Sequence, residues 1–157
     1  MGRQLDGYLQ RVVGLEDAEV MRQIRNSCRQ FMTRNTLEIG EDEQMIWFLT
    51  LENTTRPFLL VADVENQPKV GYGLIREIDG KLWLSGGILP EWRGQGLGKR
   101  LFAEMARIVN VVDKRTCWLE VRSSNSPARR TYQSLGFEYV SMNTDQWVTW
   151  TMKRERR

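Results

Sequence analysis

Apolar residues recur at steps of three and four positions in two stretches near the start of the chain. The first runs from Glu16 to Phe31 and opens with an acidic turn; the second runs from Glu41 to Leu51 and follows Gly40. This spacing gathers apolar side chains on one face, so both stretches are predicted to be amphipathic helices. The connection between them, Thr33 to Gly40, is polar, and we expect it to be mobile.

The middle of the chain changes to short apolar runs bounded by turn residues, which is the pattern of buried strands. We expect strands at Phe58–Ala62, Val70–Ile78 and Leu82–Ile88, with Asp79-Gly80 as a tight turn between the last two. Gly86-Gly87 is unusual because paired glycines weaken a strand. It marks either a simple bulge or a place where another backbone or a ligand lies close.

The second half of the chain alternates helical and strand patterns. We expect a helix from Gly96 to about Val111, a strand at Cys117–Val121, a short helix capped by Ser126 and stopped by Gly136, and final strands at Phe137–Met142 and Gln146–Met152. A short strand at Leu9–Val13 is barely visible. This order predicts an α/β (α+β) fold in which one sheet is covered by helices.

Composition narrows the class of protein. With 157 residues, 41% of them apolar, the chain suits one core, and we expect one domain over residues 1–157. A net charge of +3 with dispersed basic residues gives no support to nucleic-acid binding. Histidine is absent, and Cys28 and Cys117 have no metal-type spacing, so we expect no metal and two buried thiols. No apolar run is long enough for a membrane span and no signal-peptide core is visible, which predicts a cytoplasmic protein.

One loop carries a specific chemical signal. Arg93-Gly94-Gln95-Gly96-Leu97-Gly98 lies between an apolar strand and an amphipathic helix. The free N–H groups of a helix start attract anions, and glycines let the main chain approach a phosphate closely. The spacing fits neither a Walker loop nor a dinucleotide fingerprint. With the strand that ends at Pro90, it resembles the acetyl-coenzyme A (acetyl-CoA) pyrophosphate loop of the GNAT superfamily of N-acetyltransferases.

A second block extends the resemblance. Leu119-Glu120-Val121-Arg122, then Asn125, then Tyr132 before Leu135-Gly136-Phe137, are similar to the other GNAT hallmark. The likeness is greatest to the bacterial branch that acetylates the N-terminal amine of a ribosomal protein. The resemblance covers residues 82–137 and implies a mixed, mostly antiparallel sheet, flanked by helices and splayed between its fourth and fifth strands where acetyl-CoA enters.

The resemblance also implies a set of cofactor-binding residues. The loop residues Arg93, Gly94, Gln95, Gly96, Leu97 and Gly98 would hold the pyrophosphate, and the strand edge at Gly87 and Ile88 would pair with the pantetheine arm. Ile88 would also offer its N–H to the thioester oxygen. Asn125 is either a pantetheine contact or an ordinary turn or cap residue.

Two residues are the catalytic candidates. An acceptor amine must lose a proton, and Glu120 occupies the family's base position; otherwise it is a half-buried carboxylate paired with Arg76 or Arg122, and water is the base. Tyr132 occupies the general-acid position, where its hydroxyl would protonate the departing thiolate. Packing on a short helix is its alternative role.

The predicted function is acetyl transfer from acetyl-CoA to a primary amine, directly and within a ternary complex. The acceptor is left open between a protein N-terminus and a small molecule such as an amino sugar, because Arg25-Asn26, Phe31-Met32 and the Glu43–Phe48 stretch are similar to GNAT enzymes that acetylate amino sugars on nucleotide carriers. The alternative is a non-catalytic acyl-CoA sensor or interaction module of the same fold. We expect a monomer or a homodimer.

Overall fold

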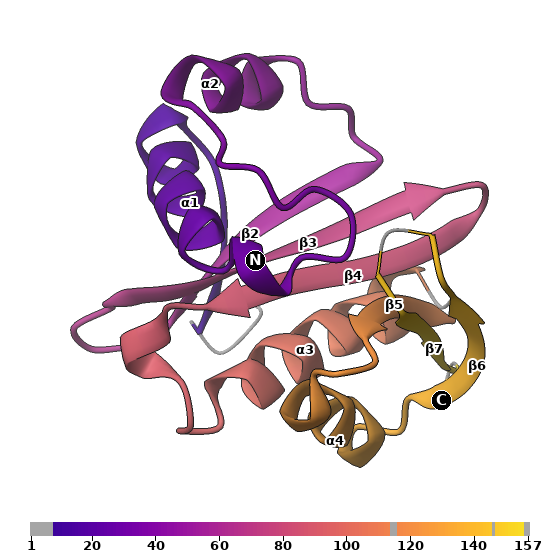
Figure 1. Ribbon diagram of the computed structural model, residues 1–157. Helices are drawn as coiled ribbons and strands as arrows, with labels where there is room; N and C mark the ends of the chain where they lie inside the picture. Colours follow the sequence, from indigo (N-terminus) through magenta and orange to yellow (C-terminus); the bar gives the residue numbers. More distant parts are fainter. Residues whose placement is uncertain (1–7, 114–115, 146, 156–157) are drawn as a thin grey trace.

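The computed structural model describes residues 8–113, 116–145 and 147–155, and it is built on one seven-stranded sheet (Figure 1). The strands lie in the order β1-β2-β3-β4-β5-β7-β6, and every neighbouring pair is antiparallel except β4 and β5. Their bounds are β1 Leu9–Arg11, β2 Thr55–Val61, β3 Lys69–Ile78, β4 Lys81–Ile88, β5 Cys117–Arg122, β6 Glu138–Asn143 and β7 Thr149–Arg154.

Helices cover both faces of the sheet. α1 and α2 lie on one face, and α3 and α4 lie on the other (Figure 1). Their bounds are α1 Leu15–Ser27, α2 Glu41–Leu49, α3 Leu97–Ile108 and α4 Ser126–Ser134, with short 3-10 turns η1 Arg29–Phe31 and η2 Pro90–Trp92 and a π-helical turn η3 Val109–Asp113. None of the helices in the described residues combines the length and the apolar character that crossing a membrane requires.

The alternation of side chains along β3 divides the core into two layers. Tyr72 packs in the layer below α1, together with Met21 and Ile24, whereas Ile75 belongs to the larger layer below α3 that contains Leu101. Successive strand residues face opposite sides, so an apolar run such as β2, buried from Pro57 to Val61, serves both layers. The helices on each face therefore fix the orientation of the strands that carry the site.

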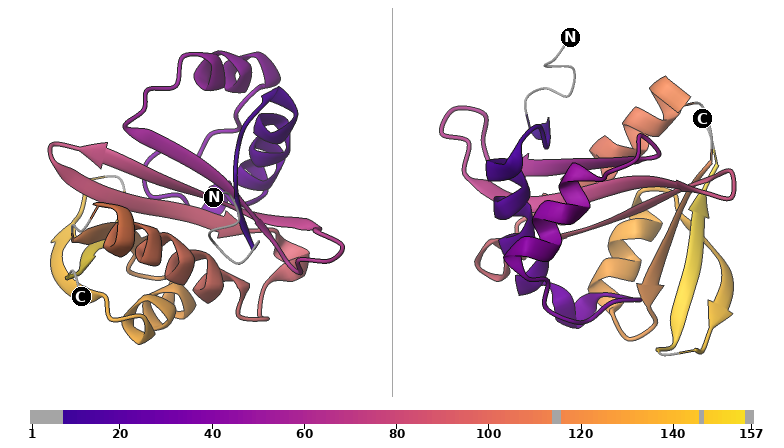
Figure 2. Two further views of the ribbon diagram at one scale, coloured as in Figure 1. Left: turned by 180° about the vertical axis from the view of Figure 1, so that it is seen from behind. Right: turned by 90° about the horizontal axis from the view of Figure 1, so that it is seen from above.

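The sheet divides between β4 and β5. The two strands pair at Leu82 with Cys117 and at Trp83 with Trp118, and no further pair follows along β4. Seen from above, β5, β7 and β6 run steeply away from β2, β3 and β4 (Figure 2). The rest of β4, through Ile88, therefore has no strand on its β5 side, and the splay expected from the resemblance is confirmed.

Most predicted elements are present, with shifted ends. The first helix ends at Ser27 and continues as the separate turn η1, and the regular part of the helix predicted from Gly96 ends at Ile108. The final strand begins at Thr149, and the predicted start at Gln146 lies outside the described residues. Asp79-Gly80 forms the expected turn, with both residues at positive φ. Cys28 and Cys117 are buried cysteines outside any disulfide, as predicted.

Gly86-Gly87 is a place of close packing, and the bulge considered for it is wrong. The pairing of β3 with β4 is continuous from Gly71 and Ile88 to the hairpin. A Cβ at Gly86 would lie 2.4 Å from the carbonyl oxygen of Tyr72, and one at Gly87 would lie 2.7 Å from Sγ of Cys28. Only glycine fits at both positions.

Gly86→Ala should therefore destabilise the fold by about 3 kcal/mol, the upper end of the usual cost of overpacking, because backbone atoms of β3 must move. Gly40→Ala is the matched control, since a Cβ there meets nothing within 4 Å; it should cost at most about 1 kcal/mol as a cap replacement. Urea unfolding of both variants measures the difference, and equal stabilities would contradict this account of the glycine pair.

Candidate active site

The free edge of β4 presents main-chain groups to the gap. The N–H of Leu89 donates to the carbonyl of Val70 at 2.8 Å, so this opposite pair is hydrogen-bonded. Because such pairs alternate along an antiparallel ladder, Ile88 and Gly86 direct their N–H and C=O groups away from β3, toward the gap, while Gly87 bonds with Tyr72. An extended amide chain in the gap would thus meet Gly86 and Ile88. Of the two predicted positions, Ile88 faces the gap and Gly87 faces β3.

The N-terminus of α3 lies after this edge and has the features that an anion site requires. Gly94 and Gly96 have φ near +80°, a conformation that only glycine adopts readily, and an added Cβ at either would meet nothing within 4 Å. The first helical hydrogen bond runs from Arg100 N–H to Gly96 C=O, which leaves the preceding N–H groups of α3 without helical partners. No side chain caps the helix. The open loop and its N–H groups fit a pyrophosphate.

Arg93 takes a position that the sequence did not predict. Its Nε donates to the carbonyl of Ile88 at 3.0 Å, its Nη2 lies 3.5 Å from Sγ of Cys28, and its guanidinium stacks on Phe31. The Cys28 thiol donates to the same carbonyl at 3.3 Å. Arg93 thus fixes the end of β4, and only the Ile88 N–H remains for a ligand. The Gln95 side chain is exposed and the Leu97 side chain is buried, so Leu97 can offer only its main chain.

Glu120 lies on β5, on the face of the sheet toward α1. Its carboxylate accepts two hydrogen bonds from Arg34, from Nε at 2.9 Å and from Nη2 at 2.7 Å. The predicted partners were wrong: Arg122 donates to the carbonyl of Met32 and stacks on Trp147, and Arg76 lies on β3, opposite Trp83. Glu120 is therefore a well-ordered carboxylate beside the gap.

Tyr132 lies on α4, on the other face of the sheet. Its ring packs edge-on against Phe102 of α3, with ring centroids 4.8 Å apart, and against Phe137. Its hydroxyl has no hydrogen bond within the part of the chain that the structure describes, and burial raises its pKa, so the hydroxyl keeps its proton at neutral pH. Burial also raises the pKa of Tyr72, which packs in the layer below α1.

Asn125 caps α4. Its Oδ1 accepts a hydrogen bond from the N–H of Ala128 at 3.3 Å, so the cap is Asn125, and the prediction of Ser126 was wrong. The cap role uses only the oxygen. The Nδ2 group makes no hydrogen bond to the described residues and can still donate to an amide carbonyl in the gap.

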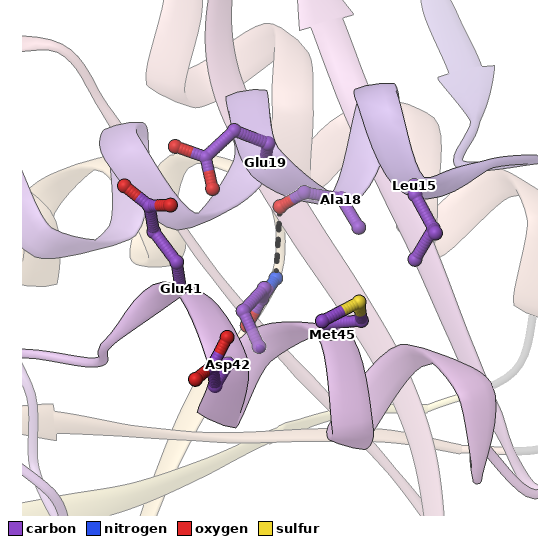
Figure 3. Close-up of a pocket in the computed structure, with 7 residues that line it drawn as sticks. Leu15, Ala18, Glu19, Glu41, Asp42 and Met45 are labelled. Atoms are coloured by element: carbon purple, nitrogen blue, oxygen red, sulfur yellow. Dashed lines mark hydrogen bonds between the residues drawn. The ribbon is translucent and has the colours of Figure 1, made fainter.

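Two cavities involve the segments around α1 and α2. The larger, of about 330 Å³, lies between the first turns of α1 and α2 (Figure 3). Its Glu19 is bound by Arg22, which holds the pKa of that carboxyl at about 2, and its Gln44 donates to the carbonyl of Ala18. This cavity is at the opposite end of α1 from Cys28 and the β4 edge, so it is separate from the gap.

The smaller cavity, of about 140 Å³, lies beside Glu120. It is lined by residues from the α1–α2 connection and from the segment that joins β6 to β7, namely Thr33, Arg34, Asn143, Asp145, Trp147 and Thr149. The Arg34 that contacts Glu120 forms one wall. The cavity thus lies on the face of the sheet opposite Tyr132.

The open helix start and the free strand edge fit a carrier that has both a pyrophosphate and a peptide-like arm. A model of the acetyltransferase (GNAT) family matches residues 19–137, and the chain belongs to this family. The family uses acetyl-CoA as cosubstrate. The chain is accordingly an acyltransferase that N-acetylates amines.

Curated relatives share one activity. The chain is 31% identical to [ribosomal protein bS18]-alanine N-acetyltransferase of Haemophilus influenzae over 114 residues, which cover 70% of this chain and 77% of that protein. It is 36% identical to the protein of the same name from Escherichia coli over 63 residues, 38% of this chain and 40% of that protein. The strongest likeness thus falls in the branch indicated by the motifs.

Solved structures confirm the fold. Spermidine N-acetyltransferase from Vibrio cholerae, in complex with CoA and spermine, superposes with a TM-score of 0.80 at 17% identity and covers 94% of each chain. A phosphinothricin acetyltransferase from Sinorhizobium meliloti, in complex with acetyl-CoA, gives 0.78 at 19% identity over 94% of this chain and 87% of that one. At such identities the likeness concerns the fold alone.

Sequence reasoning missed three residues of the site. Gly86 rather than Gly87 offers its main chain to the gap. The alternation of hydrogen-bonded pairs along the hairpin, counted from the turn at Asp79-Gly80, could have shown this. Cys28 was predicted to be buried, but its contact with Ile88 was not. Arg34 lies in a polar connection without periodicity, so no local signal ties it to Glu120.

Gly96→Val should weaken CoA binding at least tenfold, because valine cannot readily adopt the backbone angle that opens the loop and its side chain enters the space for the pyrophosphate. Gly80→Val is the matched control. Gly80 has a φ of +79°, close to the +81° of Gly96, but it lies in the β3–β4 hairpin. Both variants should lose about 1–2 kcal/mol of stability from strain. Calorimetric titration with CoA should show a loss for Gly96→Val only; equal affinities would make the loop a mere connection.

Proposed function

We propose that this chain transfers the acetyl group of acetyl-CoA directly to the α-amine at the N-terminus of a protein, with both substrates bound at once. The observation that carries this proposal is the arrangement around the gap, where Glu120, bound to Arg34 of the small cavity, lies on one face of the sheet and Tyr132 lies on the other. The name of the Haemophilus influenzae relative, which refers to an alanine of a ribosomal protein, supports a protein acceptor.

Glu120 would act as the proton acceptor. A carboxylate has about four lone-pair positions, and Arg34 occupies only one on each oxygen. The remaining positions can accept a proton from an attacking amine while the pair stays intact. The carboxylate side chain is only 13% exposed, so its orientation is held by contacts rather than averaged by solvent.

Ile88 and Tyr132 would act on the thioester. The N–H of Ile88 points into the gap and would stabilise the negative charge that develops on the carbonyl oxygen as the amine attacks. The Tyr132 hydroxyl would donate a hydrogen bond to the departing sulfur. A buried phenol is a weaker acid than a thiol of pKa near 8.5. In most turnovers the proton that ends on the sulfur would therefore come from solvent.

Different residues would bind different parts of acetyl-CoA. The loop from Gly94 to Gly98 would bind the pyrophosphate, and Gly86, Ile88 and Asn125 would bind the pantetheine amides. A cytoplasmic location fits the two free thiols and the ribosomal acceptor of the relatives, and it is part of this proposal, as is action by one chain or a homodimer.

A panel of acceptors tests the proposal. With acetyl-CoA and peptides that carry a free N-terminal alanine, the wild-type protein should release CoA thiol faster than with amino sugars. Tyr132→Phe should lower turnover about a hundredfold, near the lower end for a positioned acid, and leave CoA affinity unchanged.

Tyr139→Phe is the control, because Tyr139 packs on Trp150 of β7, at a centroid distance of 5.0 Å, and is half exposed. It should stay within about threefold of wild type. A fast amino sugar and an inert peptide would overturn the acceptor; equal rates for the two Phe variants would remove Tyr132 from the chemistry; no turnover with any amine would favour an acyl-CoA sensor.

A further inference from the structure

The α1–α2 connection is fastened to the body of the protein at both ends. Arg25, which is buried, donates to the carbonyls of Asn35 and Leu37, and Asn26 exchanges two hydrogen bonds with the main chain of Ile39, each 2.9 Å long. At the other end Arg122 of β5 donates to the carbonyl of Met32 at 3.1 Å. Arg34 lies between these attachments, so its backbone is held beside β5.

Arg34 and Glu120 form a bidentate ion pair. Two parallel N–H···O contacts, at 2.7 and 2.9 Å, give the geometry in which arginine binds a carboxylate most strongly. The hydrogen bonds and charge of Glu120 raise the pKa of Arg34, so the guanidinium remains charged at any working pH. Glu120 is therefore half of a neutral pair whose other half, Arg34, lines the small cavity.

The other charged groups around the cavity do not give it a net negative charge. Asp145 contributes a carboxylate from the β6–β7 segment, but it is exposed and also interacts with Arg34. Trp147 of the cavity wall already carries the guanidinium of Arg122, 4.0 Å from its ring. Lys153 of β7, on the same face as Glu120, lies over Trp118. The charges of Arg34 and Arg122 thus balance those of Glu120 and Asp145, and a cationic acceptor meets no net negative charge there.

This balance of charge matters because amines differ in basicity. At pH 7.5 about one third of α-amines are neutral, with pKa near 7.8, whereas roughly one in eight hundred lysine-type amines is neutral, with pKa near 10.4. A lone carboxylate would attract an ammonium ion and take its proton. A carboxylate already paired with a guanidinium would instead serve an amine that arrives neutral.

We propose that Arg34 is a specificity-determining residue, which restricts this enzyme to weakly basic amines by keeping Glu120 in a charge-neutral pair. The inference rests on the proposed acetyl transfer and names the property of the acceptor that the site selects. In each turnover the nitrogen–carbon bond forms, the carbon–sulfur bond breaks, the amine proton goes to Glu120 and the sulfur receives a proton from Tyr132 or solvent. Strongly basic amines, such as lysine side chains and polyamines, are excluded.

The test compares three acceptors in wild type, Arg34→Gln, Arg34→Lys and Arg29→Gln. The acceptors are a peptide with a free N-terminal alanine, an N-acetylated peptide with one lysine, and spermidine. The measured quantity is kcat/KM for each, and its ratio between basic and α-amine acceptors. Arg29 is the matched control because it is a half-exposed arginine near the same connection, 4.0 Å from the carboxylate of Glu38.

Arg34→Gln should raise the ratio of kcat/KM between basic and α-amine acceptors at least tenfold, because removal of the guanidinium favours cationic acceptors over the α-amine. Arg34→Lys, which keeps the charge, and Arg29→Gln should leave the ratio within about threefold. An unchanged ratio in Arg34→Gln, an equal fall for all acceptors, or a wild-type protein that already acetylates spermidine as fast as the peptide would overturn the inference. A wild-type protein that is inert toward the α-amine peptide would instead refute the proposed acceptor.

Discussion

The separation of β4 from β5 is the constraint on which the rest of this structure depends. The two strands pair at only two positions, after which each has a main-chain edge without a strand partner on the inner side of the sheet. Unpaired backbone groups away from water are costly, so such an edge is unusual unless a ligand completes it. The start of α3 follows the β4 edge after the short turn η2, so a free strand edge and an open helix start occur in succession along the chain.

Several packing details maintain that separation. Gly86 and Gly87 allow β4 to lie unusually close to β3 and to Cys28, so β4 is held by β3 and α1 rather than by β5. Arg93 reinforces the end of β4 through the carbonyl of Ile88. On the other side β5 is held by its antiparallel pairing with β7 along its whole length. The gap is thus a property of two independently anchored strands.

Arginine side chains hold the α1–α2 connection in place beside Glu120. Arg25 holds the far part of the α1–α2 connection, Arg122 holds its start, and Arg34 spans from that connection to Glu120. Arg25 and Asn26 were part of the resemblance to amino-sugar enzymes, but both side chains bind the main chain of the connection. The connection, although it was expected to be mobile, is therefore a structured wall of the small cavity.

Local patterns in the sequence predicted what local physics determines. Helical spacing, the Asp79-Gly80 turn and the glycine-rich loop gave the order of elements and the anion site, because each depends on neighbouring residues. The partner of Glu120 is 86 positions away in the chain, and no pattern within either segment predicts that pair. The cap was assigned to Ser126, with a turn or cap role left open for Asn125, because both are good cap residues in adjacent positions.

Residue-resolved amide hydrogen exchange with and without CoA tests the central claim most directly. The account predicts that CoA slows exchange at Gly86 and Ile88, whose N–H groups face the gap, and at Leu97, Gly98 and Lys99 at the start of α3. The Gly87 amide, already bonded to β3, should be protected in both states. New protection around the cavity between α1 and α2, with none at Gly86, Ile88 or the α3 start, would contradict it.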